Sequence, residues 1–323
     1  MDALSDVLRL VRLTGAVFLD AEFTAPWCVG EPSGVEVCVE HMPRAQHVVI
    51  YHLVTEGECQ VTLDGEAPRP VRAGDLIVIP GGQKHALGSD LSRPRADGAR
   101  LVVQRAPDEV PQVRYGGGGA VTKLVCGYLG CESALFDAVL APLPRIMVVD
   151  MRDGPGAQWL TSSIRFSLAE SASQRAGAGT VLAKLSELMF VEAIRRHIES
   201  LPPDQRGWLA GLRDRFTGKA LALMHARPAH PWTVEELAGH VGLSRSALAE
   251  RFTGLLGAPP MQYLTRWRLQ LAADLLRSAR RGVADVAAEV GYESEAAFNR
   301  AFKRELGTTP AAWRRTPRPP TRG

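Results

Sequence analysis

Hydrophobic and polar positions follow different periods in the two halves of the chain. Between residues 15 and 130, short apolar runs such as 47–54 and 76–79 are separated by turns that contain Gly and Asp. Asp-Gly and Gly-Asp between β-branched runs are typical of hairpins. Strands this short and this closely spaced predict a small β-barrel or a double-sheet jelly roll.

From residue 135 onward the apolar residues recur at helical spacing, which predicts helices over residues 157–172 and about 181–200. The apolar stripe of the second helix contains Val181, Leu185, Leu188, Met189, Ala193 and Ile194. This stripe is longer than one small barrel needs, so it indicates either a homodimer contact or intramolecular core, and both interpretations stay open. Residues 204–211 are interpreted as a linker, and the proline-rich tail 316–323 is expected to be disordered.

The last part of the chain contains the same supersecondary unit twice, with an offset of 50 positions. The repeated positions are Ser244, Leu248, Phe252, Gly257, Pro260 and Tyr263, which recur as Ser294, Phe298, Phe302, Gly307, Pro310 and Trp313. Each copy predicts an apolar helix, a glycine turn and a second helix that begins after a serine. That is the helix-turn-helix pattern, whose second helix lies in a DNA major groove. A long helix expected over residues 261–279 would hold the two recognition helices about one DNA turn, roughly 34 Å, apart.

The outer faces of the two second helices supply the candidates for DNA contact. Apolar residues at helical spacing point inward, which leaves polar and small residues outside. These outer residues are Arg245, Ser246, Ala249 and Glu250 in the first copy and Glu295, Ala296, Ala297 and Arg300 in the second. Arg300 is the strongest candidate for a base contact, because arginine can bind guanine O6 and N7 together. Lys303 is interpreted as a phosphate neighbour or as part of a solvated face.

Net charge adds information only when it is divided along the chain. The whole chain carries +3, but residues 222–323 hold 15 Lys and Arg against 9 Asp and Glu, while the remainder holds 23 against 26. A basic C-terminal module on a mildly acidic body is typical of a polyanion-binding domain attached to another domain. Only 5 of the 38 basic residues are lysine, so a codon bias toward arginine is an alternative source of the excess.

Composition narrows the class of protein further. No apolar run approaches the roughly 18 residues of a membrane helix, and the first residues lack the basic start and apolar stretch of a secretion signal. We therefore expect a cytoplasmic protein. The five cysteines, at positions 28, 38, 59, 126 and 131, are an odd number in a reducing compartment, which argues against a disulfide framework.

The duplicated module carries a specific set of residues. They are Leu237-Ala238, Gly242, Ser244, Leu248, Arg251-Phe252, Gly257, Pro260, Tyr263, Arg268, Ala272, Leu275-Leu276, Val286-Ala287, Gly291-Tyr292, Ser294, Phe298, Arg300, Phe302-Lys303, Gly307, Pro310 and Trp313. With them, residues 214–315 resemble the DNA-binding domain of the AraC/XylS family of transcriptional regulators. The resemblance implies recognition by the outer residues named above, with promoter DNA and RNA polymerase as partners.

A second set of residues lies in the strand-rich half. It consists of Tyr51-His52-Leu53-Val54, Gly57, Gly74-Asp75, His85 and Cys126-Gly127-Tyr128. These residues resemble the cupin sensor domains fused to some AraC-type regulators, over about residues 3–150. Cupin enzymes use a His-x-His, Glu, His ligand set, whose first positions fall here near Arg44 and Gln46 and on Ile50. The enzyme set is therefore incomplete, and a cupin-type metalloenzyme fused to a DNA-binding domain is kept as the alternative.

The histidines of this half leave two interpretations open. In the first, His52 and His85 meet inside the barrel. Cys59 or Cys126 would then complete a soft zinc site with nitrogen and sulfur ligands. Alternatively, both histidines bond to barrel backbone and bind no metal.

The cysteines leave three interpretations open. Cys126 and Cys131 form a C-x4-C pair, which would be core thiols, a zinc site completed by histidine, or a redox switch. The first five residues also resemble family members that respond to oxidants. Oxidation of one or more of Cys28, Cys59, Cys126 and Cys131 is therefore one hypothesis for the signal.

These patterns together predict an α+β chain. We expect a cupin-like β-barrel in residues 1–150, a helical coupling or dimerisation region in 151–213, a double helix-turn-helix domain in 214–315 and the tail. The expected function is that of a sequence-specific transcriptional regulator, of the activator type, whose cupin-like domain senses a small molecule or an oxidant without catalysis. A DNA-binding protein with a purely structural barrel would instead be indifferent to metabolites and oxidants.

Overall fold

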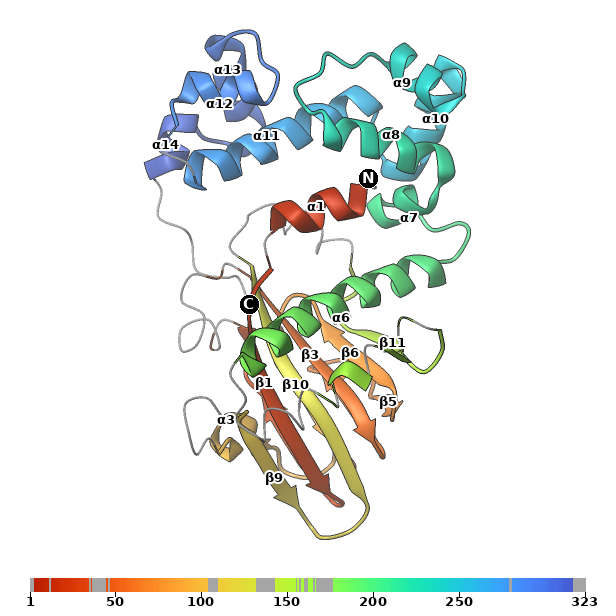
Figure 1. Cartoon of the computed structure of the whole chain (residues 1–323), viewed down its shortest axis with the longest axis vertical. Coiled ribbons are helices and arrows are strands. Elements are labelled where there is room, and N and C mark those ends of the chain that lie inside the picture. The colour runs from red at the N-terminus through yellow and green to blue at the C-terminus, as the bar shows by residue number, and fades with distance from the viewer. Residues whose placement is uncertain are drawn as a thin grey trace. The chain divides into compact units, whose positions relative to one another are not determined.

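A computed structural model gives the fold of the chain (Figure 1). It describes residues 3–11, 13–34, 36, 45, 47–103, 110–131, 143–154, 156, 158–159, 162–164, 166, 177–278 and 281–315. The predictions for the tail, for Cys38, Arg44 and Gln46, and for most of the helix over 157–172 lie outside these residues. The chain divides into a sheet-rich unit (Leu13–Glu132, Leu143–His197 and Pro320–Gly323) and a helical unit (Met1–Arg12, Ser133–Pro142 and Ile198–Pro319).

The sheet-rich unit contains two β-sheets. Its strands are β1 (Leu13–Thr24), β2 (Cys28–Glu31), β3 (His47–Glu56), β4 (Glu58–Leu63), β5 (Arg69–Arg72), β6 (Asp75–Ile79), β7 (His85–Gly88), β8 (Ala96–Asp97), β9 (Gln112–Gly116), β10 (Val121–Cys131) and β11 (Met147–Asp150). The larger sheet has the order β11-β6-β3-β10-β1-β9 and the smaller one β5-β4-β7-β2-β8. Two pairings, β1 with β9 and β2 with β8, are parallel; the others are antiparallel.

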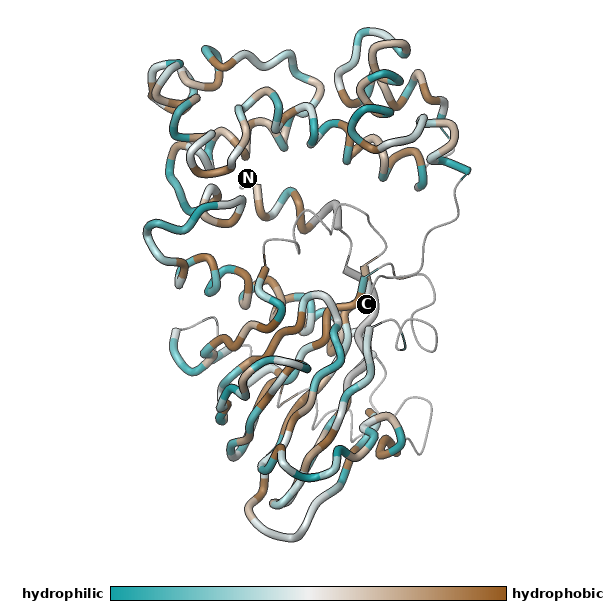
Figure 2. The backbone as a smooth tube through the Cα atoms, turned by 180° about the vertical axis from the view of Figure 1, so that it is seen from behind, coloured by the Kyte–Doolittle hydropathy of each residue, from teal (hydrophilic) through white to brown (hydrophobic). Residues whose placement is uncertain are grey.

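One apolar core lies between the two sheets. Because side chains alternate along a strand, Ile50 and Val54 of β3 point into this core, as do Val61 and Leu63 of β4 in the facing sheet. In Figure 2 the strands carry long hydrophobic stretches, and the turns between them are more hydrophilic. The sequence therefore folds into a sandwich because each sheet has one apolar face to bury.

The prediction of a closed β-barrel is wrong. Strands β9 and β11 are the edges of the larger sheet, and β5 and β8 are the edges of the smaller one. Over the described strands, no ladder joins an edge of one sheet to an edge of the other, whereas a barrel requires an unbroken ring of paired strands. The double-sheet alternative describes the unit.

Two helices in this unit have defined bounds, α3 (Gly98–Leu101) and α6 (Ala178–Ser200). Helix α6 confirms the prediction of a helix over about 181–200. It lies on the outer face of the larger sheet, where the Tyr51 hydroxyl is 2.7 Å from the Ser186 hydroxyl oxygen. Leu185 and Met189 of the predicted stripe are buried, whereas Val181 and Leu188 are 51% and 45% exposed.

The helical unit contains the duplicated module. Its helices are α1 (Ala3–Val11), α7 (Trp208–Arg213), α8 (Arg215–Ala226), α9 (Val234–Val241), α10 (Arg245–Leu256), α11 (Pro260–Ser278), α12 (Val283–Glu289), α13 (Glu295–Leu306) and α14 (Pro310–Arg315). Part of the segment predicted as a linker, residues 204–211, is the start of α7, where Leu209 and Ala210 are buried. Two apolar clusters form the core, one for each helix-turn-helix copy.

The first cluster also includes a segment from the other end of the chain. Ala3 of α1 belongs to it, and α1 contacts α8. Val7 is also buried. Helix α1 is therefore part of the helical unit, although it precedes the strands in the sequence.

Candidate functional site

The first recognition helix, α10, has the predicted start and orientation. The Ser244 hydroxyl accepts a hydrogen bond from the Ala247 amide at 3.2 Å, which caps the helix. Gly242 adopts φ 83° in the turn before it, and Leu248 and Phe252 are fully buried. The remaining face consists of exposed Arg245, Ser246 and Glu250 with Ala249 half-buried.

The second recognition helix, α13, repeats this arrangement. The Ser294 hydroxyl accepts from the Ala297 amide at 3.2 Å, and Phe298 and Phe302 are fully buried. Glycine is needed at the turn, Gly291, because an added Cβ would lie 2.7 Å from Ala229. The outer face presents exposed Glu295, Ala296, Arg300 and Lys303, with Ala297 half-buried.

The two outer faces carry opposite charge patterns. At the first helical position the copies have Arg245 and Glu295, and at the sixth they have Glu250 and Arg300. The Arg245 guanidinium is 2.8 Å from the Glu235 carboxylate on α9, so its charge is partly neutralised. Among the described residues no carboxylate forms an ion pair with Arg300. Arg300 is therefore available to an external acceptor.

Asn299 is a candidate recognition residue that the sequence analysis missed. It lies 50 positions after Ala249 and is half-buried on α13 beside Arg300. Asparagine can bind adenine N6 and N7 together. The offset of the duplication was the signal that could have found it.

Arg268 of α11 bonds to segments of both copies. Its Nε and Nη2 donate to the carbonyl oxygens of Pro228 (2.6 Å) and His230 (2.8 Å), which precede the first copy. Its Nη1 donates to the carbonyl oxygen of Gly291 in the second copy, at 3.4 Å. One guanidinium thus helps to fix the position of one copy relative to the other.

The sandwich interior contains the two histidines, and their side chains meet there. His52 and His85 come from different sheets, are 1% exposed, and their Nε2 atoms lie 2.7 Å apart. Burial holds the pKa of His52 well below its ordinary value and lowers that of His85 to about 4. Both imidazoles are therefore neutral, and one must donate to the other.

The hydrogen-bond pattern assigns the protons. His85 Nδ1 lies 3.0 Å from the Gln83 carbonyl oxygen, which can only accept, so Nδ1 carries the His85 proton. His52 Nε2 must then donate to His85 Nε2, which leaves His52 Nδ1 as an acceptor. Within the described residues this buried nitrogen has no hydrogen-bond partner.

The described residues of the sandwich do not fit a metal ion. Among the described residues, no group of three or more His, Cys, Asp or Glu side chains is placed to hold one. The two imidazoles bond to each other, and the predicted zinc set with Cys59 or Cys126 is not assembled. The second interpretation, in which the histidines bond to backbone, describes His85 but not His52.

The four described cysteines, Cys28, Cys59, Cys126 and Cys131, are buried free thiols. Burial raises the pKa of Cys59 to about 12 and that of Cys126 well above its ordinary value. A thiol reacts with oxidants as its thiolate. Their surroundings therefore favour the core-thiol interpretation over the redox one for Cys59 and Cys126.

Glu31 is a half-buried polar residue of β2 that the sequence analysis missed. It pairs in register with His85 and lies on the same face of β2 as the core residue Val29. Burial, with a smaller contribution from Asp97, raises the pKa of its carboxyl to about 7. A lone glutamate carries no sequence signal for such a position.

Comparison with known proteins matches both units. The cupin family matches residues 2–199, and a helix-turn-helix domain matches residues 237–316. A putative AraC-like transcription regulator of Streptomyces lividans is 34% identical over 99% of this chain and 100% of its own length. The HTH-type transcriptional regulator AlkR of Acinetobacter baylyi is 28% identical over 97% of this chain and 99% of its own.

Among solved structures, the DNA-binding domain of AdpA in complex with a target DNA is 33% identical, with a TM-score of 0.30. It covers 31% of this chain and 90% of that one. In the part of the chain that the structure describes, no helix is long and apolar enough to span a membrane.

Proposed function

Because the chain belongs to the AraC family of transcriptional regulators, with a cupin domain ahead of its helix-turn-helix module, we propose that α13 reads the bases of its promoter. The observation that supports this most is the exposed, unpaired Arg300 beside Asn299. These two side chain types are the ones that bind guanine and adenine bidentately. The start of α13 otherwise presents only the acidic Glu295 and the small Ala296 and Ala297.

The first copy contributes less to base recognition in this proposal. Ala249 can contact only a thymine methyl group, and Glu250 only a cytosine amine. Arg245 is engaged with Glu235 at 2.8 Å. Helix α10 would therefore position the protein on the backbone, whereas α13 supplies most of the sequence preference.

The signal, in this proposal, is a small molecule received inside the sandwich. Its support is the unpaired acceptor, His52 Nδ1, in the same sandwich as Glu31, a carboxyl group whose pKa lies near 7. A ligand with a hydroxyl or amide donor would satisfy that nitrogen, and an unmade buried hydrogen bond is costly. Oxidation of the cysteines is the less favoured signal, because burial raises the pKa of Cys59 and Cys126.

Further partners are proposed from the family and from α6. A second copy of the chain would cover the exposed Val181 and Leu188, and RNA polymerase would be the partner at the promoter. No catalytic residue is proposed. The glutamate position of cupin enzymes is occupied by Ile50, which is fully buried in the apolar core, so nothing favours the metalloenzyme alternative.

The test measures binding of the full chain to its own upstream duplex by fluorescence anisotropy. Arg300→Ala should lose about 1–3 kcal/mol at one operator position, with a much smaller loss on random DNA. Arg315→Ala, an exposed arginine on α14, is the matched control. An equal loss for Arg300→Ala on both duplexes would show that Arg300 does not read bases.

A further inference from the structure

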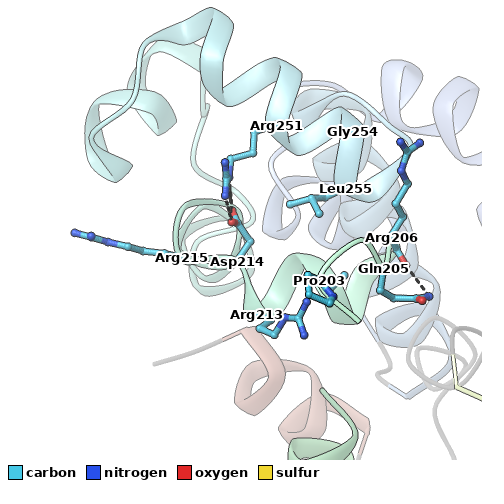
Figure 3. Close-up of a pocket in the computed structure, with 10 residues that line it drawn as sticks. Pro203, Gln205, Arg206, Arg213, Asp214, Arg215, Arg251, Gly254 and Leu255 are labelled. Carbon is cyan, nitrogen blue, oxygen red and sulfur yellow. Dashed lines mark hydrogen bonds and ion pairs between the residues drawn. The ribbon is translucent and has the colours of Figure 1, made fainter. Parts of the chain in front are cut away.

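A hollow in the helical unit lies outside the two recognition faces. It is lined by α7, the segment before it, the start of α8 and the end of α10. Figure 3 shows Arg213 and Pro203 in its centre and Arg206 beside Gly254. Arg215, at the start of α8, also lines it. Neither recognition helix presents its predicted contact residues to this hollow.

The hollow carries unneutralised positive charge. Arg251 is paired with Asp214, with its Nε 2.9 Å from Oδ1 and its Nη2 2.5 Å from Oδ2. Arg206 and Arg213 form no ion pair with any carboxylate that the structure describes. Because Asp214 is engaged by Arg251, the charges of the three other lining arginines, Arg206, Arg213 and Arg215, remain.

Arg213 is held in place without losing its charge. Its guanidinium donates to the carbonyl oxygens of Leu201 and Pro202, the latter at 2.8 Å. Carbonyl groups orient a guanidinium but do not neutralise it, so the remaining donors are pre-positioned for an anion. A guanidinium held in this way is expected in an anion-binding site, whereas an ordinary surface arginine is mobile.

Gly254 leaves room for close approach. It is exposed in the last turns of α10, and an added Cβ would meet no atom within 4 Å. Glycine destabilises a helix interior relative to alanine, so its place here is not explained by the fold. An external group can come close to the helix backbone at this point.

The position of the hollow points to the DNA backbone. Gly254 is nine residues after Arg245, which is about 13 Å along a helix. A major groove is about 12 Å wide, so the end of α10 lies near a strand that borders the groove entered by its start. The lining contains no aromatic side chain, whereas protein interfaces depend on aromatic anchors.

We propose that Arg206, Arg213 and the bare surface at Gly254 bind a backbone phosphate of duplex DNA beside the groove that α10 enters. This inference rests on the proposed DNA-binding function and adds a contact that is independent of base sequence. It would extend the footprint of the first copy beyond its recognition helix. It would also increase the salt dependence of binding.

The test uses the full chain and a random-sequence duplex of about 30 base pairs, because phosphate contacts do not depend on sequence. The dissociation constant is measured between 50 and 200 mM salt. Arg206→Ala should lower the slope of log affinity against log salt by about 0.9, so the loss of affinity across this range becomes about 3.5-fold smaller. Arg100→Ala, which removes the same charge from an exposed side chain of the sheet-rich unit, should leave the slope unchanged.

A second pair of variants avoids any loss of folding contacts. Gly254→Glu places a negative charge in open space, and Gly254→Gln is its uncharged match. The proposal is supported if Gly254→Glu binds the duplex more weakly and Gly254→Gln does not. Identical binding by both, or an unchanged slope for Arg206→Ala, overturns it.

Two further outcomes are distinguishable. Unchanged DNA affinity combined with reduced transcription in vitro would assign the hollow to an acidic protein partner and overturn the phosphate contact. If the unsubstituted chain fails to bind duplex DNA at low salt, the proposed function itself fails, and this inference fails with it.

Discussion

Replacement of Arg268 by alanine tests whether one side chain fixes the two helix-turn-helix copies relative to each other. The substitution removes donors from three carbonyl oxygens, those of Pro228, His230 and Gly291. A hydrogen bond to a charged group contributes about 1.5–3 kcal/mol. Two of these bonds are short and one is long, and the side chain is partly accessible to water. We therefore expect Arg268→Ala to lower the free energy of unfolding of the helical unit by about 3 kcal/mol.

Arg266 provides the matched control on the same helix. Its guanidinium is 3.1 Å from the Glu305 carboxylate, and its side chain is 49% exposed. An exposed ion pair contributes about 0–1 kcal/mol, so Arg266→Ala should be nearly neutral. Urea unfolding followed by the fluorescence of Trp208 and Trp232 gives the unfolding free energies of the two variants. Their affinity for a long duplex is measured in parallel.

Arg268→Lys refines the comparison. Lysine keeps the charge but not the planar arrangement of donors, so we expect an intermediate loss of stability. Equal unfolding free energies for Arg268→Ala and Arg266→Ala would refute the reasoning, because the carbonyl contacts would then contribute no more than a surface ion pair.

Further predictions concern turns, the N-terminal helix and pH. Gly291→Ala should cost clearly more stability than Gly242→Ala, since both have positive φ but only the former Cβ would clash, at 2.7 Å from Ala229; thermal melts of the two variants decide this, and equal melting points would contradict it. Val7→Ala removes two buried methyl groups, about 1.6 kcal/mol, and should speed hydrogen exchange in α8; unchanged exchange would mean that α1 does not support α8. Burial lowers the pKa of His225 to about 3 from an ordinary 6.5, so the helical unit should lose stability as pH falls below 6.5. Burial raises the pKa of Glu31 to about 7 from 4.5, so the sandwich should lose stability as pH rises from 4.5 to 7. The free energy of unfolding of each variant is measured against pH. His225→Gln should remove the loss of stability below pH 6.5, and Glu31→Gln should remove the loss between pH 4.5 and 7.

Local chemistry explains which parts of the fold were predictable from the sequence. Ser244 and Ser294 predict helix starts because their hydroxyl groups cap the amides three residues later. Phe252 and Phe302 predict the buried faces of α10 and α13 because helical spacing places them with their apolar neighbours. The duplication then gave each assignment a second, independent occurrence.

Contacts between distant segments were not predictable in the same way. A barrel and a sandwich have the same strands, and only the pairing at the edges distinguishes them. The packing of α1 on α8 joins residues that are more than 200 positions apart, with no local signal for it. The orientation of Arg213 depends on carbonyl groups of Leu201 and Pro202, which no pattern of side chains reveals.

Some residues of the candidate site were likewise identifiable from local sequence, whereas another depended on contacts between distant segments. Arg300 was identifiable because its outward position follows from the helix period and its chemistry from the side chain. Asn299 was equally visible through the 50-residue offset from Ala249. Glu31 was not, because its raised pKa arises from burial in the sandwich rather than from its sequence neighbours.

Hydroxyl-radical and methylation footprinting of the bound upstream duplex tests the central claim most directly. The account predicts two protected major-groove segments on one face of the DNA, with centres about 10 base pairs apart. Arg300→Ala should lose guanine protection in one segment and keep the other. A single protected segment, or two segments on opposite faces of the duplex, would contradict the account.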